Sequence, residues 1–325
     1  MEYVNFGSAG VKISRLALGM GLRGQADEVA AQRLVEHAID QGINLIDCAN
    51  VYGTMDDRAN IGRSEVILGK ALKGKRDDVV ITSKVCGGIG PGPNDLGLSR
   101  FHILREVERS LKRLDTDHID IYLVHSFDQH TPQEETIRAL DDLVHSGKVR
   151  YVGCCNYAAW QVCRALWLAD KVNAMPYMCV QNPYSLLNRR LEQEIFGLVR
   201  ELGLGVMAYS PLAVGLLSGA YKPGEPAPAG SLWATRRKDI FGRTMEGVVA
   251  DVVKAVYDSA AALGKTPAQV ALAWVLSHRE VTVAISGADT IEQLNDNLGG
   301  VGWTLPAEVR EKLDDVSASI SLILD

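Results

Sequence analysis

The sequence predicts a single-domain (β/α)8 TIM barrel over residues 1–325, and two observations carry that prediction. Eight short apolar segments along the chain each lead into a segment with the apolar spacing of a helix. The apolar segments are continuous, as in Val79-Val80-Ile81, whereas strands exposed on one face would alternate. Eight such strand–helix units in succession are typical of a barrel whose strands are covered by helices.

Taken in order, the chain begins with a β-hairpin signal from Phe6 to Ile13, which turns at Gly7-Ser8-Ala9-Gly10. The eight expected strands then span Arg15–Met20, Asn44–Ala49, Val79–Val85, Ile119–Val124, Val149–Cys155, Tyr177–Gln181, Gly205–Tyr209 and Val281–Ser286. The helices expected after them span Ala26–Gln41, Arg63–Lys73, Arg100–Leu114, Pro132–Ser146, Ala158–Lys171, Arg190–Leu202, Gly247–Arg279 and Thr290–Leu298. An extra C-terminal helix is expected over Pro306–Val316.

Helix boundaries follow from ordinary end signals. Glycines that suit a left-handed cap stand where four of the helices end, at Gly42, Gly74, Gly147 and Gly203. Residues 222–230, after the seventh strand, form the stretch richest in proline and glycine. In a barrel this stretch predicts a mobile loop over the pocket, because the loops after the strands all lie on one face.

A second fold competes with the barrel. Gly19, Gly21 and Gly24 match the G-x-G-x-x-G fingerprint of a dinucleotide-binding Rossmann domain, between a strand and a helix. Asp47 lies at the end of the next strand, where such a domain places its ribose-binding acid. We favour the barrel because eight strand–helix units follow one another, whereas a Rossmann domain needs about six strands.

Composition excludes several classes of function. The formal net charge of −6 argues against a general nucleic-acid binder, which would present a basic face. The sequence has no apolar run of about 18 residues and no signal-peptide pattern, so we expect a cytoplasmic protein with no membrane span. None of the 6 cysteines forms a C-x-x-C pair, and no cluster has zinc spacing, so no metal site is expected.

Chemistry-bearing side chains stand at the ends of three consecutive expected strands. Asp47 is near the end of the second strand with Tyr52 just beyond it, Lys84 ends the buried run of the third, and His125 follows the fourth. The carboxyl ends of barrel strands converge on one face, so these residues are expected to share a pocket. The alternative is a purely structural Asp47–Lys84 ion pair with His125 satisfied in the core.

This set suits the reduction of a carbonyl. A tyrosine hydroxyl has a pKa near ~10, and we expect the Lys84 ammonium to lower the pKa of Tyr52 toward the working range. Asp47 would keep Lys84 charged and in place, and His125 would donate a hydrogen bond that orients the carbonyl. Because no redox-active side chain or metal set is present, the hydride must come from a cofactor.

The chain also resembles a known family over nearly its whole length. The stretches that carry the resemblance are Asn44-Leu45-Ile46-Asp47 through Tyr52-Gly53, Gly62-Arg63-Ser64-Glu65, Thr82-Ser83-Lys84, Val124-His125, Gly147-Lys148-Val149-Arg150-Tyr151-Val152-Gly153, Ser210-Pro211-Leu212 and Ile285-Ser286-Gly287-Ala288. Together they resemble the aldo-keto reductase superfamily, and within it the bacterial branch that is itself similar to potassium-channel β subunits. The resemblance implies that Asp47, Tyr52, Lys84 and His125 form a catalytic tetrad.

The resemblance also implies a set of nicotinamide-dinucleotide contacts. Asn156 and Gln181 would hold the carboxamide, Tyr209 would stack on the nicotinamide, and Ser210, Leu212 and Gly215 would surround the pyrophosphate. At the adenosine end the corresponding residues are Gly287, Asp289, Gln293 and Asn297. The chain departs from the family pattern at Cys155, where a serine is common, and at Ala220, where a lysine is often found.

The nucleotide stays open between NADP(H), the family default, and NAD(H). A basic residue at position 289 would pair with the 2′-phosphate of NADP, whereas Asp289 would repel it and hydrogen-bond a free ribose hydroxyl.

The expected function is hydride transfer between a nicotinamide and a small aldehyde or ketone, including a sugar, with Tyr52 as the general acid or base. Trp233, in the loop after the seventh strand, is expected at the substrate pocket. One alternative is a cofactor-binding regulatory subunit with slow turnover, like a channel β subunit. A barrel hydrolase is disfavoured because it would need a metal set or paired carboxylates at the strand ends.

Overall fold

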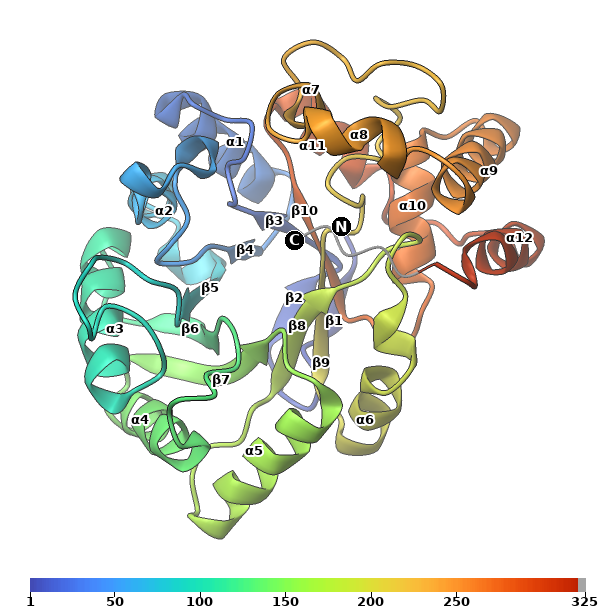
Figure 1. The fold of residues 1–325 in the computed structure, drawn as a ribbon. Helices are drawn as coiled ribbons and strands as arrows, with labels where there is room; N and C mark the ends of the chain where they lie inside the picture. The colour runs from blue at the N-terminus through green and yellow to red at the C-terminus, as the bar shows by residue number, and fades with distance from the viewer. Residues whose placement is uncertain (321–325) are drawn as a thin grey trace.

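The computed structural model of the protein describes residues 1–320 as a closed barrel of parallel strands inside a ring of helices (Figure 1). The barrel closes in the order β10-β3-β4-β5-β6-β7-β8-β9. Its strands are β3 (Leu16–Gly19), β4 (Leu45–Asp47), β5 (Val80–Val85), β6 (Ile119–Val124), β7 (Val149–Cys155), β8 (Cys179–Pro183), β9 (Gly205–Tyr209) and β10 (Val283–Gly287). The predicted fold class is therefore confirmed.

Helices follow the strands as the sequence predicts. They are α1 (Glu28–Asp40), α2 (Arg63–Ala71), α3 (Arg100–Leu114), α4 (Gln133–His145), α5 (Ala159–Lys171), α6 (Ile195–Leu202), α7 (Leu232–Thr235), α8 (Lys238–Thr244), α9 (Val248–Leu263), α10 (Pro267–Leu276), α11 (Ile291–Leu298) and α12 (Ala307–Ser317). Short 3-10 turns lie at Thr54–Asp56, Arg58–Asn60, Arg76–Asp78 and Arg190–Glu192. The extra C-terminal helix is present as α12.

A separate hairpin of β1 (Tyr3–Asn5) and β2 (Lys12–Ser14) closes the barrel where its strands begin. Phe6 and Ile13 are fully buried in the cluster inside the barrel, together with Leu45 and Met207. Gly7 lies so close to the start of β9 that a Cβ on it would meet the amide nitrogen of Gly205 at 2.5 Å. The bottom of the barrel is therefore plugged, and the cavity described below opens at the other end.

The chain after β9 differs from the sequence prediction in two places. The single helix expected over Gly247–Arg279 is two helices, because Gly264 ends α9 in the left-handed region and Thr266 caps a new helix that starts at Pro267. The long loop expected after β9 contains the short helices α7 and α8, which lie next to one another at the top of the view in Figure 1.

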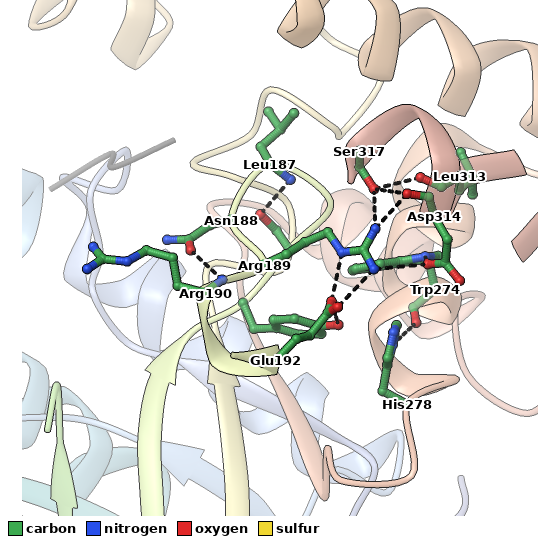
Figure 2. A network of polar contacts seen from close by, with 12 residues as sticks. Leu187, Asn188, Arg189, Arg190, Glu192, Trp274, His278, Leu313, Asp314 and Ser317 are labelled. Atoms are coloured by element: carbon green, nitrogen blue, oxygen red, sulfur yellow. Dashed lines mark hydrogen bonds and ion pairs between the residues drawn. The ribbon is translucent and has the colours of Figure 1, made fainter. Parts of the chain in front are cut away.

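A network of polar residues attaches α12 to the chain that follows β8 (Figure 2). The guanidinium of Arg189 donates to both carboxylate oxygens of Glu192 at 2.8 Å and to the carbonyl oxygen of Asp314 at 2.7 Å. It also lies 5.4 Å from the centre of the Trp274 ring, whose Nε1 donates to Asp314 at 2.8 Å. One arginine thus links α10, α12 and the loop between β8 and α6.

Candidate active site

A cavity of about 760 Å³ opens where the barrel strands end. The side chains of Asp47, Tyr52 and His125 reach it from β4, from the loop that follows β4 and from the end of β6. All ten residues that the family resemblance assigned to the dinucleotide line it as well: Asn156, Gln181, Tyr209, Ser210, Leu212, Gly215, Gly287, Asp289, Gln293 and Asn297. The structure therefore brings these thirteen predicted site residues together around one cavity.

Lys84 lies directly behind this cavity and has no exposed surface. Its ammonium donates to the Asp47 carboxylate at 2.7 Å and to the carbonyl oxygen of Cys48 at 2.9 Å. The ammonium also lies 4.7 Å from the centre of the Tyr52 ring. A buried cation is tolerated only when paired, so Asp47 accounts for its presence at this depth.

The Asp47 carboxylate has further partners that hold it in place. Thr82 donates to it at 2.5 Å and the side-chain amide of Gln181 donates at 2.8 Å, both to the oxygen that Lys84 does not contact. Sequence reasoning did not identify Thr82. The sequence feature that could have identified Thr82 is its position two residues before Lys84, because alternate residues of a strand face the same side.

Tyr52 and His125 meet at the cavity wall. The Tyr52 hydroxyl lies 3.4 Å from Nε2 of His125, and the two rings meet edge to face with centroids 5.6 Å apart. Burial, together with the nearby Lys84 ammonium, lowers the pKa of His125 to about 3. The imidazole is therefore neutral near pH 7 and can offer either one N–H donor or one acceptor at Nε2.

The charge balance at Lys84 and Tyr52 differs in part from expectation. Burial alone would lower the pKa of Lys84, but the Asp47 carboxylate outweighs it and the pKa is raised above its ordinary value. Burial raises the pKa of Tyr52, and the opposing effect of the Lys84 ammonium is smaller. The expectation that Lys84 brings the pKa of Tyr52 below its ordinary value is thus wrong for this structure, because burial dominates.

Two polar residues join the cavity wall between β7 and β9. Asn156 adopts a left-handed backbone with φ of 59° and donates from its side chain to the carbonyl oxygen of His125 at 3.0 Å. Its amide oxygen accepts from the Tyr209 hydroxyl at 2.9 Å. At the position where the family often has serine, the Cys155 thiol lies 3.6 Å from Oε1 of Gln181, a weak contact.

The chain after β9 makes an unusual turn along the cavity. Ser210, Ala213, Val214 and Gly215 all have positive φ, of 52°, 49°, 55° and 88°. Left-handed backbone is costly for residues other than glycine, and such strain concentrates at ligand-binding segments. This turn faces the cavity at Ser210, Val214 and Gly215.

The far wall is formed by the end of β10 and the start of α11. Asp289 lies there with one carboxylate oxygen accepting from the backbone N–H of Gly24 at 3.1 Å. Its own backbone N–H donates to Gln293 at 2.8 Å, and Asn297 donates to Ser286 at 3.1 Å. Burial raises the pKa of Asp289, opposed only by the Gly24 hydrogen bond. The Gly24 of the G-x-G-x-x-G match therefore contacts the acid after the last strand.

Trp233 does not lie where the sequence reasoning expected it. Its side chain is fully buried, its Nε1 donates to the carbonyl oxygen of Val214 at 2.9 Å, and its ring packs against Phe241. It is absent from the lining of the cavity, which its neighbours Leu232 and Arg236 reach instead. Trp233 therefore holds the strained turn after β9 from behind.

Among the side chains that the structure describes within residues 1–320, no group of three or more histidine, cysteine, aspartate or glutamate residues is arranged to hold a metal ion. Within the same range, none of the helices combines the length and apolar character that crossing a membrane requires.

Comparison with known proteins agrees with the geometry. The model described as "Aldo/keto reductase family" matches residues 15–318. The chain is 41% identical to the uncharacterized oxidoreductase YrpG of Bacillus subtilis (strain 168), over 97% of this chain and 96% of that protein. It is 35% identical to a "probable voltage-gated potassium channel subunit beta" of Arabidopsis thaliana, over 93% of this chain and 91% of that protein. A protein of the same name from Oryza sativa subsp. japonica is 34% identical, over 98% of this chain and 97% of its own length. Because the family model and these relatives span nearly all of the sequence, the protein belongs to the aldo/keto reductase family of oxidoreductases.

Proposed function

We propose that the protein interconverts a small aldehyde or ketone and its alcohol by hydride transfer, with Tyr52 as the general acid or base. The observation that carries the proposal is the buried Lys84–Asp47 pair, 2.7 Å apart, placed directly against the Tyr52 ring at the cavity wall. A fully buried lysine is costly, and a cation beside a tyrosine favours its phenolate form. A barrel that needed only a filled core would carry apolar side chains there.

The cavity fits a nicotinamide dinucleotide in size and in chemistry. Its volume of about 760 Å³ is within the range of small-molecule and cofactor sites. Asn156 and Gln181 would hold the carboxamide beside the tetrad, and Tyr209 would contact the ring. The turn at Ser210–Gly215 would hold the pyrophosphate, and Gly287, Gln293 and Asn297 would hold the adenosine end. A nicotinamide bound in this way supplies or accepts the hydride.

The residues of this chain have separable roles in that reaction. Neutral His125 presents Nε2 toward the Tyr52 hydroxyl and orients the carbonyl oxygen near it. As negative charge develops on that oxygen, Tyr52 delivers its proton, and the Lys84 ammonium stabilises the phenolate that remains. Asp47, held by Thr82 and Gln181, keeps Lys84 in place. In the reverse direction the phenolate accepts the alcohol proton.

Turnover with a generic carbonyl tests this function. With purified protein, NADPH or NADH and 4-nitrobenzaldehyde, loss of nicotinamide absorbance should accompany formation of the alcohol. Lack of turnover with a panel of aldehydes, despite tight binding of a dinucleotide, would favour the alternative of a regulatory subunit. Two relatives carry channel-subunit names, but a tetrad with intact contacts favours catalysis.

The cofactor of this proposal is NAD(H) rather than NADP(H), because of the charge at Asp289. This carboxylate lines the cavity, and its one hydrogen bond within the described residues comes from a backbone N–H rather than from a cation. A phosphate placed against it would add like charge in a partly buried site, whereas a ribose hydroxyl would donate a hydrogen bond. The position equivalent to the frequent family lysine is Ala220, which offers no compensating charge.

A fluorescence titration with NADH and NADPH tests this preference. We expect NADH to bind about tenfold more tightly or better, and Asp289→Asn to remove most of that ratio by relieving the repulsion of the 2′-phosphate. The matched control is Glu292→Gln, which removes one negative charge from α11 at an exposed position outside the cavity lining. Equal binding of both nucleotides by the wild type contradicts the preference, and binding of neither contradicts the proposed function.

A further inference from the structure

A layer of buried polar residues lies behind the site, between strands β4 and β5 and helices α2 and α3. Glu65, in the first turn of α2, is fully buried. One of its oxygens accepts from the Ser83 hydroxyl at 2.5 Å, and the other accepts from Nε of Arg113, on α3, at 2.6 Å. A buried carboxylate lowers the stability of the fold unless both of its oxygens are paired, so Glu65 needs its contacts with both Ser83 and Arg113.

Through Ser83, Glu65 is connected to the strand that presents Lys84. Ser83 and Lys84 are neighbours on β5, and successive side chains of a strand point to opposite faces. Ser83 therefore faces the helices while Lys84 faces the barrel interior. The contact between Glu65 and Ser83 fixes this part of β5 from outside, one residue away from the ammonium.

The residue before Glu65 is connected to the loop that presents Tyr52. The backbone N–H of Ser64 donates to the carbonyl oxygen of Tyr52 at 3.3 Å. The hydroxyl of Ser64 donates to the carbonyl oxygen of Ala49 at 3.2 Å. In the same loop, the side-chain amide of the fully buried Asn50 donates to Glu106, on α3, at 3.5 Å. The first turn of α2 thus contacts both segments whose separation sets the distance between Tyr52 and Lys84.

We propose that Ser64 and Glu65 are positioning residues that hold the Tyr52 loop and the Lys84 strand at the spacing proton transfer requires. This inference rests on the proposed function, in which Lys84 acts on Tyr52. The charged and titratable groups that face Tyr52 are Lys84 from β5, Asp47 from β4, His125 at the end of β6 and Cys155 from β7. Glu65 is not among them, so it acts by holding the backbone of β5 in place and not by a direct effect of its charge on Tyr52.

Two variants test the inference, and the chain offers a matched control. Ser83→Ala cuts the contact between Glu65 and β5, and Ser64→Ala removes the hydroxyl that holds the carbonyl oxygen of Ala49. Ser110→Ala is the control, since Ser110 is equally buried and accepts from Arg113 at 3.2 Å but contacts neither catalytic segment. We expect kcat for 4-nitrobenzaldehyde to fall by about tenfold in the two test variants, because small misplacements of catalytic groups are costly. The KM and the dinucleotide Kd should stay within about twofold, because the cavity lining is intact.

A solvent isotope effect separates positioning from loss of stability. When the Tyr52 proton transfer becomes slower, kcat in D2O should fall further below kcat in H2O for Ser83→Ala than for wild type or Ser110→Ala. The inference is overturned if Ser83→Ala and Ser110→Ala have the same kcat and isotope effect, or if the loss of kcat follows only the loss of thermal stability in all three variants. An inactive wild type would overturn the proposed function and this inference with it, whereas an active wild type with equal variants overturns the inference alone.

Discussion

His125 shows how one residue's surroundings determine both its role and its effect on stability. Its pKa is lowered to about 3 in the folded protein, mainly by burial and then by the Lys84 ammonium, against about 6.5 in an unfolded chain. Below pH 6.5 the unfolded chain therefore binds a proton that the folded protein does not. This residue's contribution to stability is complete above that pH and is lost as the pH falls toward 3.

The unfolding free energies of wild type and His125→Asn, compared at pH 7 and pH 5, test this contribution. Between pH 7 and pH 5 the wild type should lose about 1–2 kcal/mol more unfolding free energy than the variant, because only the wild type carries this histidine. Denaturant unfolding at both pH values measures the difference, and identical losses would show that His125 is not held neutral. For the same reason, kcat/KM of the wild type should show no acid limb near pH 6.5.

For single residues, the sequence indicated where the reacting groups lie but not their pKa values. Asp47, Lys84 and His125 were predictable because polar residues at the ends of buried strands converge on one face. The pKa of Tyr52 was not predictable, because the cost of burial depends on neighbours from several strands. The predicted position of Trp233 at the substrate pocket was wrong, because the sequence of a polar loop does not show whether the loop folds over an aromatic residue and buries it.

Among the elements, α12 depends on Arg189 for its attachment to the barrel. The Arg189 side chain is only 16% exposed, and the carboxylates of Glu192 and Asp314 both face it (Figure 2). Removing one partner of such a network leaves unpaired charge, which costs more than the network itself contributes.

Arg189→Met should therefore lower the free energy of unfolding by about 2–3 kcal/mol, a value reduced from that of a fully buried pair because the side chains are partly exposed. Arg190→Met is the control, because the neighbouring residue is exposed and its hydrogen bonds to Asn188 and Gln193 are made by its backbone. Denaturant midpoints measure both variants. Equal, small losses in the two would show that the network does not hold α12.

Element boundaries were predictable where local chemistry determines them and not elsewhere. The caps at Gly42, Gly147 and Gly203 were read from the sequence and have positive φ in the structure. The break between α9 and α10 was present as Gly264-Lys265-Thr266-Pro267 but was hidden by continuous apolar spacing on both sides. Trp160 and Trp167 on α5 are both more than half exposed, because the buried face of this helix is formed by smaller residues such as Val162 and Ala165.

For the whole molecule, the hairpin that plugs the barrel should matter as much as any strand. Gly7 has a φ of +57°, and an added Cβ would meet the backbone of β9 at 2.5 Å. Gly7→Ala should therefore cost at least about 2 kcal/mol, from left-handed backbone strain and the clash together. Gly10→Ala, in the same hairpin, is the control, because nothing lies within 4 Å of its added Cβ. Thermal unfolding compares the two, and similar stability of both variants would mean that the hairpin moves freely from the barrel.

Deuterium labelling follows the transferred hydride itself. Wild type and Tyr52→Phe are each incubated with NADH or NADPH deuterated at the transferable C4 position and with 4-nitrobenzaldehyde, and the alcohol is analysed by mass spectrometry. Wild type should place deuterium on the alcohol carbon, whereas Tyr52→Phe should bind the dinucleotide with a similar Kd but form product at least about a hundredfold more slowly, because the proton donor is missing. Product without deuterium, or equal rates for the two proteins, would contradict hydride transfer at a tyrosine-centred site.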